Sequence, residues 1–198
     1  FVVLLLGTAL NVLLLAEEGK LSLDDKLSRY EPQAPNADNI TIRHLLNMTS
    51  GLFDYTSDST FWGTVLTNAN RVWTPRELVD VAVSHTPKFS PGMQFEYSNT
   101  NYILLGMIIE KVTGNKIGDE IRTRITDKLG LTSTAYAETG EMTGQYMHGY
   151  MPVDSGELAD ITGGNPSWGG FAGAMVSNLH DLKIWAKALV EGTLLTPE

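Results

Sequence analysis

The sequence predicts a mostly helical fold. Several segments place apolar residues three and four positions apart, the spacing of one helix face, and each begins or ends at a recognisable capping residue. No alternating apolar and polar run is long enough to build a large sheet, and no internal repeat is present. With 198 residues, 42% of them hydrophobic and 19% charged, the chain has the composition of one globular domain or part of one.

The first predicted helix is the most apolar segment of the chain. Residues 1–16 read FVVLLLGTALNVLLLA, and Glu17, Glu18 and Gly19 end this run as they would end a helix in a water-soluble protein. The run falls short of the roughly 18 or more apolar residues that span a bilayer, and no basic residue precedes it. We therefore expect a buried core helix, with a signal or membrane segment as the alternative.

The next segments show weaker signals. Ser22 and Asp25 have the spacing of a capping box before a short helix, and Thr41 predicts the start of a second helix. Ser50 and Gly51 are expected to end that second helix. Residues 53–71 have little periodicity, which predicts a loop.

Stronger helix signals follow. Thr74, Pro75 and Glu77 combine a cap, a first-turn proline and a capping-box acid, so they predict a helix from about residue 75 to 85. Asn99 or Thr100 is expected to cap the best-defined helix, which ends at Gly114. The remaining predicted helices cover residues 117–128 and 178–191, and residues 130–176 are expected to be irregular.

Composition excludes several functions. The net charge of −9 and the absence of a Lys/Arg-rich run argue against nucleic acid as a partner. Zero cysteines exclude thiolate chemistry, disulfides and cysteine-bound metal, and leave the compartment open. His44, His85 and His180 have no His or carboxylate at metal-ligand spacing, and no HExxH motif occurs. We expect neither a metal nor a cofactor, and treat these histidines as packing or surface residues.

The segment Tyr97-Ser98-Asn99 carries the chemistry of interest. It lies just before a predicted helix, so its side chains are held at a fixed loop-to-helix junction. A tyrosine hydroxyl can relay a proton if a nearby cation lowers its pKa, and an amide two residues on can bind a substrate carbonyl. The alternative is a buried tyrosine beside a helix-capping asparagine.

Five segments resemble successive blocks of one family: GKLSLDDKLSRYEP, ITIRHLLNMTSGLFDY, PGMQFEYSNTNYILLGMIIEKVTG, DKLGLTSTAY and GGFAGAMVSNLHDL. The chain is similar, over nearly all of its length, to the serine β-lactamase-like or penicillin-binding family, of the class C β-lactamase and D-alanyl-D-alanine carboxypeptidase type. The resemblance implies an α+β, β-lactamase/transpeptidase-like fold. Residues 1–198 would form a partial domain that holds mainly the helical subdomain and the active-site loops and lacks the N-terminal strands and the C-terminal sheet strands.

The family carries a Ser-x-x-Lys, a Tyr-x-Asn and a His-x-Gly or Lys-Thr-Gly motif, which together form an acylating site. Only the second is present here, and it implies that Tyr97 is the proton relay and that Asn99 anchors a substrate amide. Trp168 resembles an aromatic residue that lines the substrate cleft of the secreted carboxypeptidases. Counting back from the Glu17-Glu18-Gly19-Lys20 block, the resemblance implies that the nucleophilic Ser position falls on Val2 and the Lys position on Leu5, neither of which can act as nucleophile or base.

Three hypotheses follow from this resemblance. In the first, the sequence is an incomplete or altered version of that of an active serine hydrolase. In the second, the chain is a catalytically inactive homologue that binds peptidoglycan peptides. In the third, it is a membrane-associated module without enzymatic activity. For the hydrolase, the expected substrates are D-Ala-D-Ala peptides, β-lactams or esters, with carboxypeptidase or esterase activity favoured over lactamase activity. The resemblance also implies a periplasmic or extracellular location. The pair His148-Gly149 precedes the expected third motif and is interpreted as surface structure.

Overall fold

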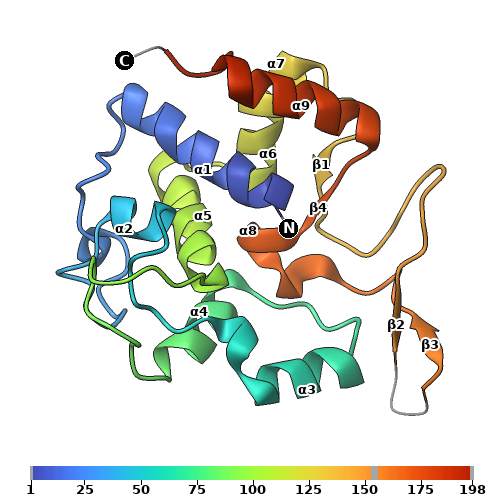
Figure 1. The fold of residues 1–198 in the computed structure, drawn as a ribbon, viewed down its shortest axis with the longest axis horizontal. Helices are drawn as coiled ribbons and strands as arrows, with labels where there is room; N and C mark the ends of the chain where they lie inside the picture. The colour runs from blue at the N-terminus through green and yellow to red at the C-terminus, as the bar shows by residue number, and fades with distance from the viewer. Residues whose placement is uncertain (1, 153–155, 197–198) are drawn as a thin grey trace.

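The computed structural model describes residues 2–152 and 156–196, and for residues 2–5 it describes the backbone (Figure 1). Helices dominate it, and the strands are two or three residues long. The longer helices are α1 (Val2–Glu17), α3 (Ser59–Thr67), α4 (Pro75–Val83), α5 (Asn99–Thr113) and α9 (Leu179–Glu191). The shorter helices are η1 (Leu27–Arg29), α2 (Ile42–Leu46), η2 (Tyr55–Ser57), α6 (Ile117–Ile121), the π-helical η3 (Arg122–Thr126), α7 (Asp127–Leu129), η4 (Pro166–Trp168) and α8 (Gly170–Gly173). The strands are β1 (Ala135–Tyr136), β2 (Tyr150–Pro152), β3 (Leu158–Asp160) and β4 (Met175–Val176).

Helices α1, α5 and α8 pack against one another at the centre of the molecule (Figure 1). The buried Thr8 hydroxyl of α1 donates a hydrogen bond to the Phe171 carbonyl of α8 at 3.1 Å. On α5, a Cβ at Gly106 would lie 2.2 Å from the Phe171 ring, so only glycine allows α5 and α8 to approach this closely. The close approach brings three segments far apart in the sequence into one core.

Helix α1 is a core helix, as its sequence predicts. Val12 and Leu15 are completely buried in the main hydrophobic cluster. Gly19 has the left-handed backbone of a helix terminus, and the Lys20 N–H donates to the Leu15 carbonyl at 2.9 Å, so the predicted C-terminal cap is confirmed. Within residues 2–152 and 156–196, no helix combines the length and apolarity that crossing a bilayer requires.

Helix α2 ends earlier than predicted. Thr41 caps it as expected, but the last helical residue is Leu46 rather than one next to Ser50 and Gly51. Gly51 instead lies where two loops meet, since a Cβ there would be 2.1 Å from the Phe89 carbonyl oxygen. Glycine is therefore required at this position by the close approach of two backbone segments and not by a helix end. The two requirements cannot be distinguished in the sequence, because both select glycine.

The prediction of a loop over residues 53–71 is wrong, because this segment contains η2 and α3. The Asp58 carboxylate caps α3 by accepting the Phe61 N–H at 2.7 Å. Phe61 is buried, with ring centroids 5.1 Å from Tyr55 and 4.9 Å from Trp73. Aromatic packing with Tyr55 and Trp73 thus stabilises a helix that the weak periodicity of the segment did not indicate.

The Ser22 and Asp25 spacing also produces a different structure from the one predicted. The Ser22 N–H donates to the Asp25 carboxylate at 3.0 Å, but the pair closes a turn, and η1 begins only at Leu27. A side chain that can accept a backbone N–H serves a turn as well as a helix start, so the motif alone does not distinguish them.

The other predicted helices are present. Thr74 and Glu77 form the expected capping box of α4, Gly114 ends α5, and Asn178 and Gly192 bound α9. The helical run predicted over residues 117–128 is continuous but contains the π-helical η3.

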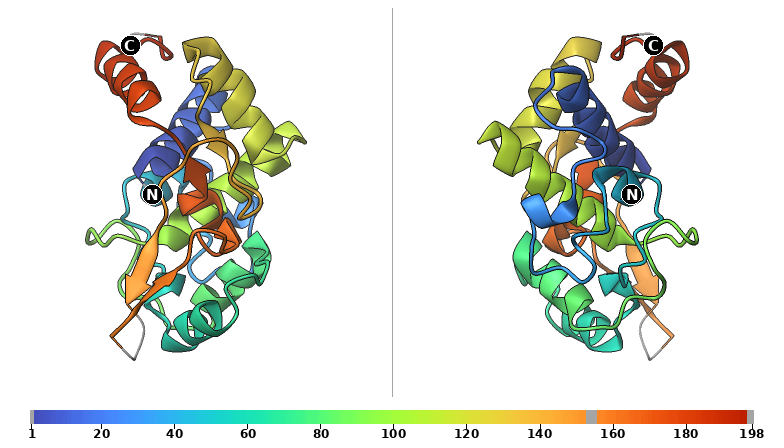
Figure 2. Two further views of the ribbon diagram at one scale, coloured as in Figure 1. Left: turned by 90° about the vertical axis from the view of Figure 1, so that its right-hand side faces the viewer. Right: turned by 90° about the vertical axis from the view of Figure 1, so that its left-hand side faces the viewer.

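The region predicted to be irregular contains two small antiparallel sheets. Strands β1 and β4 pair close to the helical body, and β2 and β3 form a hairpin that extends away from it in both Figure 1 and Figure 2.

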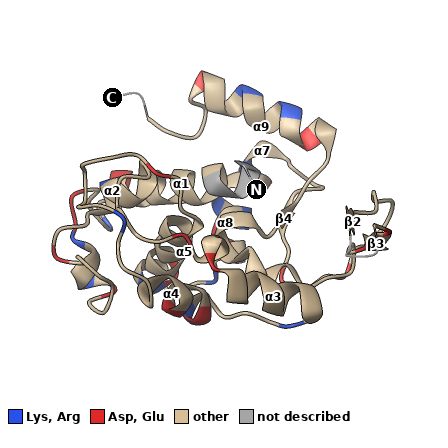
Figure 3. Ribbon diagram, turned by 60° about the horizontal axis from the view of Figure 1, so that its bottom comes forward, with Lys and Arg blue, Asp and Glu red and all other residues tan. Residues whose placement is uncertain are grey.

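In the view of Figure 3, lysine and arginine positions are scattered among acidic and uncharged ones on the helices.

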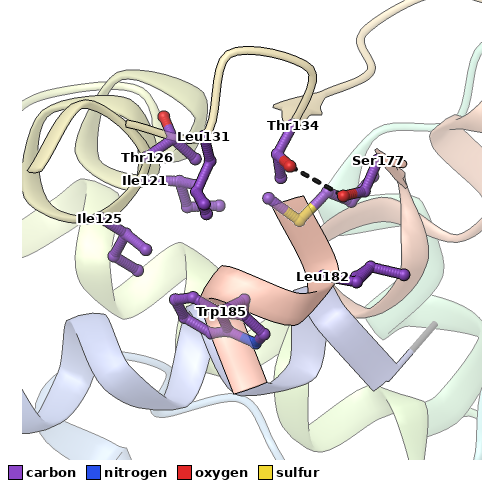
Figure 4. A pocket seen from close by; sticks show the side chains of 10 residues that line it. Ile121, Ile125, Thr126, Leu131, Thr134, Ser177, Leu182 and Trp185 are labelled. Atoms are coloured by element: carbon purple, nitrogen blue, oxygen red, sulfur yellow. Dashed lines mark hydrogen bonds between the residues drawn. The ribbon is translucent and has the colours of Figure 1, made fainter. Parts of the chain in front are cut away.

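A small cavity lies beneath α9 (Figure 4). Ile121, Ile125, Leu131 and Trp185 line it together with neighbouring side chains. Its volume of about 10 Å³ matches roughly one water molecule. The cavity is therefore too small for an organic substrate, and it belongs to the packing of α9 on the body.

Candidate active site

The segment Tyr97-Ser98-Asn99 occupies the predicted loop-to-helix junction. Ser98 is extended, with φ −149° and ψ 117°, and Asn99 is the first residue of α5. The Ser98 side chain makes no capping hydrogen bond. Asn99 lies inside the helix and Thr100 follows it, so neither is the cap that the sequence indicated. The Asn99 amide is consequently available for contacts outside α5.

Tyr97 and Asn99 contact each other directly. The Tyr97 hydroxyl donates to Asn99 Oδ1 at 2.9 Å. Tyr97 is 43% exposed, whereas Asn99 is 6% exposed. The Tyr97 phenol thus lies at the surface, and the buried Asn99 amide holds its hydroxyl in place.

The other end of the Asn99 amide binds the segment before α3. Asn99 Nδ2 donates to the Asp54 carboxylate, at 3.1 Å from Oδ2 and 3.4 Å from Oδ1, and to Thr56 Oγ1 at 3.2 Å. Asp54 is itself buried. The sequence analysis missed Asp54 and Thr56 because it assigned their segment to a loop. An acidic residue among apolar neighbours in GLFDY was the signal that could have identified Asp54.

Local electrostatics keep the Tyr97 hydroxyl protonated. Burial raises the pKa of the Tyr97 phenol above its ordinary value, and the Asp54 carboxylate raises this pKa further. A proton relay needs the opposite shift, which a neighbouring cation would supply. The sequence analysis expects the family's lysine, a group of that charge, at the position of Leu5, and that assignment remains a prediction.

Trp168 is tied to the same segment through Tyr55. The buried Tyr55 hydroxyl donates to the Trp168 carbonyl oxygen at 2.9 Å. The Trp168 ring is partly buried and lies 5.3 Å, centroid to centroid, from Trp62 of α3. Asp54 and Thr56 hold Asn99 while Tyr55 holds Trp168, so a three-residue stretch links the predicted substrate-binding residues.

Val2 and Leu5 lie three residues apart in the first turns of α1, the spacing that places two side chains on one helix face. Their side chains lie outside the part of the chain that the structure describes. Helix α1 contacts α8, which directly follows Trp168 in η4. The fold therefore brings the helix that carries positions 2 and 5 next to the segment that carries Trp168.

Three histidines, His44, His85 and His148, have structural contacts, and His180 is exposed. His85 has a carboxylate partner, since its Nε2 lies 2.9 Å from Asp58 Oδ2, and its ring stacks on Phe53 at 3.9 Å. The sequence concealed this pair because the two residues are 27 positions apart. His44 completes the cap of α2, and His148 is half-exposed and contacts Asp160. Among the residues described, no three His, Asp or Glu side chains gather as a metal site would require.

A helical subdomain with a Tyr-x-Asn motif at a loop-to-helix junction is typical of the serine β-lactamase-like proteins, and the fold is β-lactamase/transpeptidase-like. The family described as Beta-lactamase matches residues 6–198. The chain belongs to the Beta-lactamase family. The match begins after Val2 and Leu5, so those two positions lie outside it.

Several known proteins are similar. Penicillin-binding protein 4* of Bacillus subtilis (strain 168) is 36% identical over 149 residues, covering 73% of this chain and 32% of that protein. A D-stereospecific amidohydrolase from Streptomyces sp. superposes with a TM-score of 0.93 at 36% identity, covering 98% of this chain and 60% of that one. The D-amino acid amidase from Ochrobactrum anthropi SV3, complexed with L-phenylalanine, has a TM-score of 0.81 at 34% identity, covering 98% and 54%. The chain thus spans about a third of this curated relative and little more than half of these solved structures.

Proposed function

We propose that this chain forms the helical half of a serine hydrolase site that acts on D-configured amides or peptides through an acyl-enzyme. The observation that carries the proposal is the contact between the Tyr97 hydroxyl and the buried Asn99 amide at the start of α5. Trp168, linked to the same segment through Tyr55, would form one wall of the substrate site.

The chemistry requires a serine on α1. Its hydroxyl oxygen attacks the substrate carbonyl, the C–N bond breaks, and the departing amine takes up the proton that the serine loses. Tyr97 and a lysine on α1 would carry that proton, and backbone N–H groups would hold the oxyanion. Water then hydrolyses the acyl-enzyme. With Val2 and Leu5 at the serine and lysine positions, the first step needs residues that these two cannot supply.

The substrate class rests on the relatives. Two of the similar structures are named for D-stereospecific or D-amino acid amide hydrolysis, and the curated relative is named for penicillin binding. We favour a small amide, peptide or ester over a β-lactam as the substrate. No nucleic acid partner is proposed, and an exported location fits the penicillin-binding relatives.

The test is covalent labelling with a fluorescent penicillin, followed by intact-mass measurement. The chain as printed is expected to form no adduct, whereas Val2→Ser with Leu5→Lys is expected to gain the mass of one penicillin. Adding Tyr97→Phe to that double variant should slow labelling by roughly a hundredfold, the scale of a lost general acid–base group. Labelling of the printed chain would show that the site is not at positions 2 and 5.

A second function is favoured by the residues at those same positions. Val2 and Leu5 lack any nucleophilic or basic atom, so the site would bind peptidoglycan-like peptides without cleaving them. The printed chain would then bind a D-Ala-D-Ala peptide measurably in calorimetry, and Trp168→Ala would weaken the binding. If calorimetry detected no heat of binding at millimolar peptide concentration, this second function would be excluded.

A further inference from the structure

The hairpin formed by β2 and β3 presents a face of aromatic and acidic side chains to solvent. Tyr150 pairs with Asp160 in its register, so these two side chains lie on the same face. His148 and Tyr146 continue this face, since the ring centroids of Tyr146 and His148 are 5.3 Å apart and those of His148 and Tyr150 are 6.4 Å apart. Tyr146 is 42% exposed and Tyr150 is 57% exposed. These four residues are called the hairpin face below, and the hairpin that carries them projects from the helical body in Figure 1 and Figure 2.

Hydrogen bonds fix the carboxylate of the hairpin face. Asp160 Oδ2 lies 2.7 Å from His148 Nδ1, and Asp160 Oδ1 accepts the Thr162 N–H at 2.9 Å. Hydrogen bonds from Thr162, followed by one from His148, lower the pKa of Asp160 to about 2, so this carboxylate is charged at neutral pH. A fixed negative charge thus lies beside a row of exposed rings. Both features attract a cation, the carboxylate by its charge and the rings through their faces.

The charge of the surrounding segment selects the same kind of partner. Residues 129–182 contain no Lys or Arg. Their acidic residues are Glu138, Glu141, Asp154, Glu157, Asp160 and Asp181. An anionic partner would be repelled by this segment, whereas a cationic one is attracted before contact.

The hairpin also leaves backbone groups unpaired at its edges. Within residues 2–152 and 156–196, β2 and β3 pair only with each other. The Ile161 N–H donates to the Gly149 carbonyl at 2.9 Å, so this pair is hydrogen-bonded across the ladder. Hydrogen-bonded and outward-pointing pairs alternate in an antiparallel ladder. The backbone groups of the next pair, Tyr150 and Asp160, therefore point toward the two edges.

The two edges differ in one donor. The next outward-pointing pair is Pro152 on β2 and Leu158 on β3. Proline has no N–H, so the β2 edge lacks a donor there, whereas the β3 edge keeps the Leu158 N–H. The β3 edge is thus the better place for another strand to pair.

We propose that the hairpin docks an extended basic peptide segment of a partner protein. The segment adds as a strand to the edge of β3, and every second side chain of it, a lysine or arginine, lies over the hairpin face. Such a side chain forms an ion pair with Asp160 and is long enough to contact the Tyr150 ring of the neighbouring strand. Backbone pairing distinguishes this partner from a polyamine of equal charge. The docking uses neither Tyr97 nor Asn99, so it does not depend on the proposed hydrolysis.

The first test measures binding of a fluorescein-labelled peptide that alternates lysine and valine, by anisotropy with the full chain at neutral pH and 0.15 M salt. The peptide is acetylated and amidated, and its length gives it the same charge as spermine. We expect the unlabelled peptide to displace the labelled one at about tenfold lower concentration than spermine does, because spermine has no backbone to pair with β3. A matching peptide of glutamate and valine should not compete. Equal competition by spermine, or no binding of the peptide, would overturn the proposal.

Variants of the hairpin face test the side-chain contacts. Tyr146→Ser with Tyr150→Ser should weaken peptide binding about tenfold through the loss of two cation–ring contacts. Asp160→Asn should weaken it about threefold, the scale of an exposed ion pair. Asp127→Asn is the control, since it removes the same charge from an exposed position on α7. If Asp127→Asn weakened binding as much as Asp160→Asn, the attraction would come from net charge and the proposal would fail.

A pair of substitutions tests the strand addition. Leu158→Pro removes the outward N–H of the β3 edge, while Leu158→Ala removes most of the same side chain and keeps the N–H. We expect Leu158→Pro to bind the peptide about fivefold more weakly than Leu158→Ala, the scale of one lost hydrogen bond. Thermal melting of each variant checks that the helical body is unchanged. Equal binding by the two variants would overturn the strand addition.

Discussion

Asn99 contributes to the candidate site because it does not cap a helix, the role that asparagine most often has at such a position. Asparagine before an apolar helical run is usually a cap, yet here it is the first helical residue and its amide reaches Asp54. Gly106 shows the same principle for backbone: it sits in the middle of a helix, where glycine costs stability, because the Phe171 ring occupies the place of a side chain. At this scale, tertiary neighbours determine what a residue does.

The contact at Gly106 predicts the effect of one methyl group. Gly106→Ala would place a Cβ 2.2 Å from the Phe171 ring, so α5 and α8 must separate or the ring must move. We expect a loss of about 1–3 kcal/mol in the free energy of unfolding, measured by urea denaturation. Gly63→Ala in α3 is the control, because nothing lies within 4 Å of its added methyl, and it should gain about 0.5–1 kcal/mol. A neutral Gly106→Ala would mean that α8 is not held against α5.

Helices in this chain are stabilised by two kinds of contact. Some ends are determined locally, as in α4, where Thr74 and Glu77 satisfy each other's backbone N–H groups. Others depend on distant partners, as in the pairing of Arg124 in η3 with Glu18 at the end of α1. The first kind is tested by removing a cap, and the second by changing the charge of one partner.

The cap of α4 predicts a local loss of stability. Thr74→Ala removes the acceptor of the Glu77 N–H and is expected to cost about 1 kcal/mol in the free energy of unfolding, measured by urea denaturation. Lys116→Ala is the comparison, since Lys116 precedes α6 without a side-chain capping bond and should change stability by less than about 0.5 kcal/mol. Equal effects of the two substitutions would show that the Thr74 cap adds nothing to stability.

The Arg124 contact predicts a pH dependence. Hydrogen bonds from Arg124 and then Lys20 lower the pKa of Glu18 from its usual 4.5 to about 2. A lowered pKa in the folded state means that this stabilisation is complete above pH 4.5 and is lost as the pH falls toward 2. Because Glu18 is largely exposed, we expect at most about 1 kcal/mol. Thermal unfolding of Glu18→Gln and of the original chain should differ at pH 6 and converge near pH 2, and a constant difference would contradict the linkage.

At the scale of the whole molecule, α9 is held by its inner face and leaves apolar side chains outside. Trp185 packs with Leu10 and Leu14 of α1, whereas Leu179 is 85% exposed and Val190 is 89% exposed. Exposed apolar side chains of this size favour association. The sequence analysis expected a partial domain, and that expectation remains a prediction.

This surface predicts the behaviour of the isolated 198-residue chain. We expect its apparent mass in size-exclusion chromatography with light scattering to rise with concentration, because the exposed side chains of α9 are removed from water on association. Leu179→Gln with Val190→Lys should reduce the effect, while Lys187→Gln on the same helix should not. A chain that stays monomeric at all concentrations and melts in one cooperative transition would count against the partial-domain interpretation.

The sequence by itself determined the features that depend on neighbouring residues. The helix ends at Gly19, Gly114 and Gly192, the capping box at Thr74 and the place of Tyr97 before α5 all follow from short-range backbone hydrogen bonding, and the structure confirms each of them. The resemblance to the family could also be recognised from the sequence, because the order of the matching segments along the chain does not depend on tertiary contacts.

Tertiary structure alone decided what depends on partners far along the chain. The Trp73 ring, which lies beyond the end of α3, packs on Phe61, and His85 meets Asp58 across 27 positions. The Asn99 amide takes its direction from Asp54, 45 positions earlier. A side chain's local signal states which hydrogen bonds it can make, but burial selects which of them it must make, because an unsatisfied polar group away from water costs more than any local preference supplies.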